Sequence, residues 1–63
     1  MTRTAAIKDL DTHIAALTAI RADYDAIAKA CTDSHVIAHL REQSALFTGY
    51  IAQARADRSA INY

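Results

Sequence analysis

Three side chains of the kinds that ligate metal ions occur close together near the middle of the chain. His35 and His39 are four residues apart, the spacing that places two imidazoles on one helical face, and Cys31 lies four residues before His35. A zinc site would need a further ligand, with Glu42, His13 or a second subunit as candidates. A break in the helix is expected between Cys31 and His35, so the three side chains need not converge. We interpret them as polar residues near a turn and at an interface, and we predict neither metal nor cofactor.

Cys31 is also a candidate nucleophile, with His35 as its base. Such catalysis needs an oriented third group and an oxyanion hole inside a pocket that excludes water. A chain of 63 residues leaves little room for that pocket. We therefore interpret Cys31 as a small, buried apolar residue at the end of a helix, and we predict that the protein is not an enzyme.

A group of basic residues lies near the two ends of the chain. Its members are Arg3, Lys8, Arg55 and Arg58. If the chain folds back on itself, these residues come close to Tyr50 and Tyr63, and arginines beside tyrosines can bind an anionic ligand or a phosphate backbone. Three aspartates in the same region reduce the positive charge. The arrangement is thus a candidate anion site, with a mixed solvated surface as the alternative.

The composition points to helices as the elements that position these residues. Fifteen of the 63 residues are alanine, the best helix former, while the chain has no proline and one glycine. The formal net charge is zero, so the chain lacks the basic field with which nucleic-acid-binding proteins attract phosphates. The fold class is predicted to be all-α.

The same sequence argues against membrane insertion, secretion and a disulfide framework. The longest apolar run, residues 14–17, is four residues long, whereas a bilayer span needs roughly 20. No apolar stretch of signal-peptide length follows the first residues. A single cysteine excludes an internal disulfide and fits a reducing compartment. We expect a cytoplasmic protein.

Two helices, at about 4–31 and 34–61, are predicted to form a single domain over residues 1–63. Thr2 or Thr4 can cap the first helix, and Asp33 or Ser34 the second. The short connection between them makes the helices antiparallel neighbours in an αα-hairpin. The alternative is one continuous helix in a long coiled coil. The heptad phase of the first helix, however, does not run through 31–34 into the second.

Each predicted helix carries an apolar seam with alternating spacings of three and four. In the first helix the seam is Ile7, Leu10, Ile14 and Leu17, after which we predict a slip of one residue to Ile20, Tyr24, Ile27 and Cys31. In the second helix it is Ile37, Leu40, Ser44, Phe47, Ile51, Ala54 and Ile61. Arg58 occupies a seam position near the end, where we expect the seam to fray.

The second helix has another stripe that an isolated hairpin does not need. It consists of Val36, His39, Gln43, Leu46, Tyr50 and Gln53, again spaced by three and four, with Gly49 nearby. Large apolar groups mixed with amides and a phenol are typical of an interface. A glycine inside a helix lowers the stability of that helix. Its presence is explained if another backbone approaches it closely. The alternative is neutral sequence drift at a surface site that tolerates substitution. The predicted assembly is a homodimeric four-helix bundle or a higher helical oligomer.

The function expected from these features is that of a small non-enzymatic protein-interaction module. Short, glycine-poor, neutral helical proteins commonly act as inhibitors, adaptors or regulators, often in phage or plasmid systems. The helical oligomer would dock a larger protein partner. The alternative is a bundle that binds RNA or an anionic nucleotide at the Arg/Tyr cluster near the chain ends.

Overall fold

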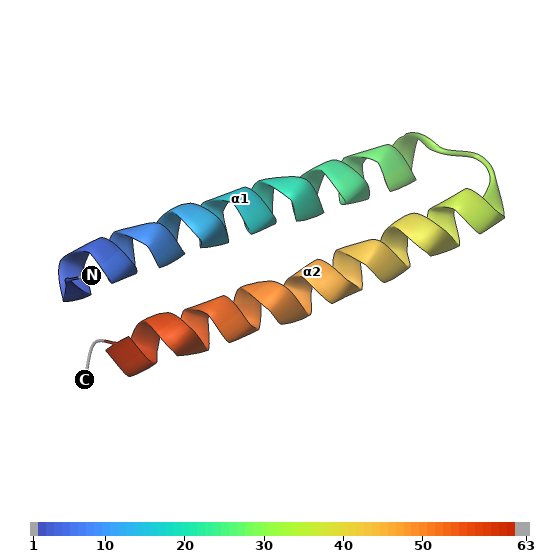
Figure 1. Cartoon of the computed structure of the whole chain (residues 1–63). Helices are drawn as coiled ribbons and strands as arrows, with labels where there is room; N and C mark the ends of the chain where they lie inside the picture. Colours follow the sequence, from blue (N-terminus) through green and yellow to red (C-terminus); the bar gives the residue numbers. More distant parts are fainter. Residues whose placement is uncertain (1, 62–63) are drawn as a thin grey trace.

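The chain folds into two antiparallel α-helices of equal length (Figure 1). A computed structural model describes residues 2–61, and within that range it contains α1 (Arg3–Ala30), α2 (Ser34–Ile61) and no strand. The predicted all-α hairpin is thereby confirmed. Its helix bounds differ from those expected from the sequence by no more than one residue.

Both helices begin at a side-chain cap. Thr2 precedes α1, and its hydroxyl accepts a hydrogen bond from the Ala5 N–H at 3.1 Å. Asp33 precedes α2, and its Oδ1 accepts from the N–H groups of His35 at 2.8 Å and Val36 at 3.2 Å. These bonds satisfy N–H groups that a helix start leaves without partners. The capping predictions at Thr2 and Asp33 are confirmed.

The connection between the helices is the segment 31–33, which has no helical structure. The last turn of α1 contains Lys29, a cation where the helix dipole favours one. Cys31 adopts an extended conformation, and its N–H donates to the Ile27 carbonyl at 3.0 Å. The chain therefore turns sharply here, and the continuous-helix alternative is wrong.

The apolar seam predicted for α2 is confirmed. Leu40, Ile51 and Ala54 are buried, and the other seam residues are partly buried. The ring of Phe47 packs against Tyr24 of α1 at a centroid distance of 5.6 Å.

The slip predicted in α1 is wrong, because the heptad register continues without interruption. Ala28 is 3% exposed, whereas Ile27, which the slip would have buried, is 51% exposed and Ile20 is 41% exposed. Arg21 takes the seam position and is partly buried, with its Nη1 donating to the Thr48 hydroxyl at 3.4 Å. Because a long arginine side chain can bury its stem and extend its charge outward, the helix keeps its register.

The seam also continues past Arg58 instead of fraying. Arg58 forms an ion pair with Asp11 of α1, with 2.5 Å between Nε and Oδ1. Ile61, one turn further on, is still partly buried. The cation at this seam position is thus matched by an acidic residue of the other helix.

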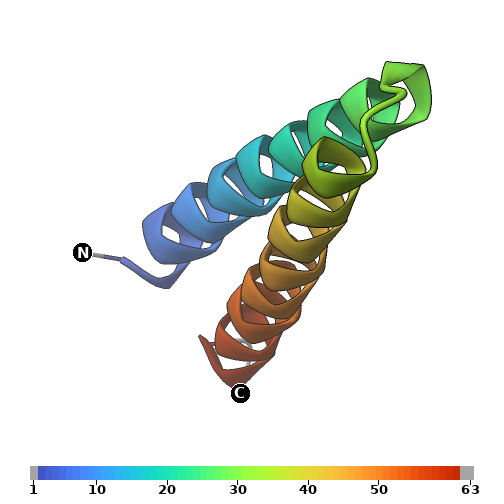
Figure 2. The ribbon, with the colours of Figure 1, turned by 90° about the vertical axis from the view of Figure 1, so that its right-hand side faces the viewer.

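The hairpin is long and thin, with extents of 47 × 14 × 13 Å. Figure 2 shows the two ribbons close together near the turn and further apart near the chain ends. Leu17, Ala28, Leu40, Ile51 and Ala54 are its buried hydrophobic residues. Because one helix–helix contact buries so little, a hairpin of this size is only marginally stable alone.

Candidate interaction surface

Five large hydrophobic side chains are exposed among the residues that the structure describes. They are Ile20 and Ile27 of α1, and Val36, Leu46 and Tyr50 of α2. Single exposed hydrophobic residues are ordinary on a protein surface. What distinguishes these five is their common direction.

All five lie on the same face of the hairpin. With the seams as a and d positions, they fall at g and c positions of the heptad in both helices. In an antiparallel pair the g positions of both helices flank one side of the seam and the e positions flank the other. We call the side formed by these g and c positions the apolar face. From α1 it contains Ala6, Asp9, His13, Ala16, Ile20, Asp23, Ile27 and Ala30, and from α2 Val36, His39, Gln43, Leu46, Tyr50, Gln53, Asp57 and Ala60.

Contacts across the hairpin support this assignment. His13 of α1 and Tyr50, Gln53 and Asp57 of α2 line the same surface hollow. The ring of Tyr50 also meets the seam ring of Phe47 edge to face, at a centroid distance of 5.5 Å. Tyr50 therefore extends the seam outward onto the apolar face.

The opposite side of the hairpin carries more cations than anions, with two aspartates, Asp11 and Asp25, and several exposed alanines among them. The lysines and arginines there are Lys8, Arg21, Lys29, Arg41, Arg55 and Arg58, at a, b and e positions. We call this side the basic face. Arg21 and Arg58 extend toward it, as their bonds to Thr48 and Asp11 show. In residues 2–61 the apolar face carries no lysine or arginine.

The predicted interface residues of α2 are largely accessible. Val36, His39, Leu46 and Tyr50 are exposed, and Gln43 is partly buried. Ile20 and Ile27 belong to the same surface, which the sequence did not reveal because the expected slip assigned them to the seam. The uninterrupted spacing Leu17–Arg21–Tyr24–Ala28 is the signal that identifies them as outward-facing.

Gly49 lies on the side of α2 that faces away from α1. A Cβ atom at this position would meet nothing within 4 Å. Within the hairpin, no backbone approaches the glycine. The close approach suggested by its presence could thus come only from another molecule.

The four predicted anion-binding residues are not equivalent in the structure. Lys8 and Arg55 are exposed on the basic face, and Arg3 is exposed at the first residue of α1. Arg58 is bound to Asp11, whose hydrogen bond and negative charge raise the pKa of the guanidinium above its ordinary value. Of the two tyrosines expected nearby, Tyr50 lies on the apolar face, and Tyr63 is outside the described residues.

The candidate metal ligands do not form a cluster. Within residues 2–61, no three histidine, cysteine or acidic side chains are placed to hold one metal ion. Cys31 lies partly buried in the turn, while His35 and His39 are exposed on α2.

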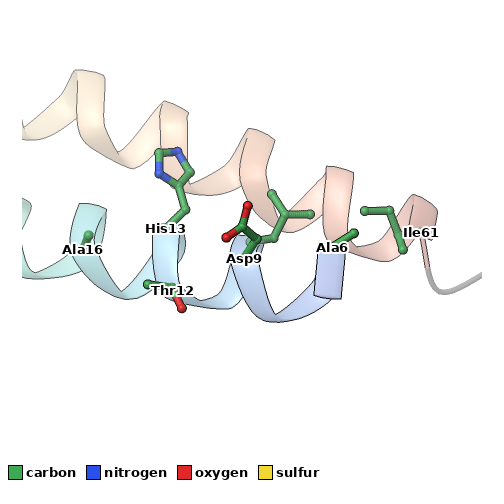
Figure 3. Close-up of a pocket in the computed structure, with 7 residues that line it drawn as sticks. Ala6, Asp9, Thr12, His13, Ala16 and Ile61 are labelled. Carbon is green, nitrogen blue, oxygen red and sulfur yellow. The ribbon is translucent and has the colours of Figure 1, made fainter. Parts of the chain in front are cut away.

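One surface hollow lies at the open end of the hairpin (Figure 3). It has a volume of about 630 Å³, and its lining includes Ala6, Asp9, Thr12, His13, Ala16 and Ile61. The lining combines small and aliphatic side chains with the polar groups of Asp9, Thr12 and His13.

Neither helix is long and apolar enough, over the residues described, to cross a membrane. Comparisons of the chain with protein-family models, with curated proteins and with solved structures find no match.

Proposed function

We propose that the chain is a small, non-enzymatic protein-interaction module that works as a helical oligomer and docks a larger protein. The observation that carries the proposal is the gathering of the five exposed large hydrophobic side chains on one face of the hairpin. Large hydrophobic side chains gathered on one exposed face and mixed with polar groups are typical of an association site. A homodimeric four-helix bundle is the simplest assembly that covers it.

The surface area of the hairpin supports association. A compact monomer of 6.9 kDa exposes about 4,000 Å². This hairpin exposes 4588 Å². The excess is comparable to the roughly 800 Å² that each partner buries in a standard interface. A hairpin of this length buries little surface by itself. Association through the apolar face would thus add buried surface.

The basic face is the surface that such a bundle leaves for its partner. Arg41 and Arg55 are exposed, and neither forms an ion pair in the structure of residues 2–61. Cations on one side of a helical bundle complement an acidic surface. We therefore expect the larger partner to present an acidic patch.

Binding of RNA or an anionic nucleotide is the second candidate. It is favoured by the same row of cations, which includes Lys8, Arg55 and Arg58 of the predicted anion site. Phosphate binding weakens steeply with salt because counterions are released. Binding of a single-stranded RNA probe that falls off steeply between low and physiological salt would favour this candidate.

The association step is tested by placing a charge on the apolar face. Leu46→Glu should halve the molar mass measured by light scattering, because it replaces one of the five exposed hydrophobic side chains with a charge that association would have to desolvate. Ala22→Glu is the matched control, since it adds the same side chain at an exposed site outside the apolar face. Equal masses for Leu46→Glu and the unchanged protein would contradict the proposal.

Docking of the partner is tested by a second variant. Arg41→Glu/Arg55→Glu should keep the oligomeric mass and lose the partner that the unchanged protein captures in photo-cross-linking. A partner retained by this variant would show that the basic face does not bind it.

A further inference from the structure

The apolar face is uneven along its length. Its bulky members lie in the half nearer the turn and at the middle, namely Val36, Ile27, Leu46, Ile20 and Tyr50. The half nearer the chain ends carries alanines and polar residues, and it contains the hollow shown in Figure 3. One molecule thus presents both a bulky surface and a hollow, at opposite ends of the same face.

We propose that a second copy of the chain covers this face in antiparallel orientation, so that the turn of each copy lies over the open end of the other. The inference rests on the proposed function and specifies how its oligomer is built. A two-fold axis perpendicular to the long axis of the hairpin generates this arrangement. Because of this symmetry, every contact between two different residues occurs twice in the dimer.

Shape complementarity favours the antiparallel arrangement. With full overlap, the bulky side chains nearest one turn, Ile27 and Val36, meet the open half of the other copy, where Ala6 and Ala60 leave room. In a parallel dimer the two bulky halves would meet each other, and the two hollows would face each other unfilled. Interfaces pack to the density of protein interiors, so the first arrangement is the better one.

Carboxylates lie on the apolar face in both of its halves. Asp9 and Asp57 stand beside the two hollows near the open end, while Asp23 lies in the half nearer the turn, as does His39. A parallel dimer would bring Asp9 and Asp57 toward their own copies, and like charges facing each other across an interface are costly. An antiparallel dimer separates these two carboxylates from their own copies and moves them toward the half that carries His39 and Asp23.

The turn gives a direct reporter of orientation. Thr32 is exposed, and Cys31 is the single cysteine, so Cys31→Ser/Thr32→Cys provides one site for a nitroxide spin label. Pulsed dipolar spectroscopy of the dimer should give a separation approaching the 47 Å length of the hairpin. A separation below half of that length would overturn the antiparallel arrangement.

A mixed sample provides the complementary measurement. Cys31→Ser/Ala5→Cys carries the label at the open end, where Ala5 is exposed. Mixed with turn-labelled protein, it should give a short distance between the unlike labels, and a long distance would contradict the proposal. The molar mass separates the two ideas: a dimer with turn labels close together overturns the orientation alone. A protein that stays monomeric overturns the proposed function as well.

Discussion

At the scale of single residues, a substitution at Gly49 distinguishes two situations. Either nothing packs against this glycine, as in the isolated hairpin, or a second molecule approaches it closely. The glycine is exposed within α2, and a Cβ atom would meet nothing. Gly49→Ala should therefore raise the free energy of unfolding by about 1 kcal/mol, because alanine loses less conformational freedom in a helix. Urea unfolding measures the change.

A decrease in the free energy of unfolding of Gly49→Ala would have a different meaning. If the alanine variant unfolds more easily and has a lower oligomeric mass, a second molecule approaches α2 at this position. Ala45→Gly, at another exposed site of the same helix, is the control, and it should lose about the same amount through propensity alone.

Arg21 shows how one residue can mislead a reading of the sequence. An arginine on a seam looks like an interruption, so the apolar rhythm is more easily continued through Ile20 and Ile27. In the structure, the guanidinium extends to Thr48, and its seam position is kept. Whether a long charged side chain lies along a packed surface or displaces it depends on the neighbouring helix, which periodicity in one helix does not reveal.

At the scale of the helices, the start of α2 depends on Asp33. Its carboxylate accepts two backbone hydrogen bonds, from His35 and Val36. Asp33→Ala should lower the free energy of unfolding by about 1 kcal/mol, while Asp33→Asn should retain most of it, because asparagine caps about as well as aspartate. Chemical unfolding monitored by helical circular dichroism measures both. Equal stability of the alanine variant and the unchanged protein would contradict this role.

Much of the helical architecture was predictable from local chemistry. Three features depend only on residues within a single helix. They are the alanine content, the capping residues Thr2 and Asp33, and the regular apolar seam of α2. The missed feature, the common direction of Ile20, Ile27, Val36, Leu46 and Tyr50, arises between elements. It requires the register of both helices together, so the stripe on α2 was recognisable while its continuation onto α1 was not.

At the scale of the whole molecule, the hairpin divides its charge and hydrophobicity between two sides. Six cations lie on the basic face beside Asp11 and Asp25, while the opposite face carries three aspartates, two histidines and the exposed hydrophobic residues but no lysine or arginine in residues 2–61. A net charge of zero hides this separation. It permits a dimer to bury its apolar faces without burying a lysine or arginine, and to keep both basic faces free for a partner.

Coverage of the apolar face by a second copy can be tested by the molar mass of the unchanged protein across a range of concentrations. Sedimentation equilibrium should give a mass near twice 6.9 kDa, falling toward that of one chain only on dilution and with a loss of helical signal. A fully helical protein that keeps a mass of 6.9 kDa at every concentration would contradict the account.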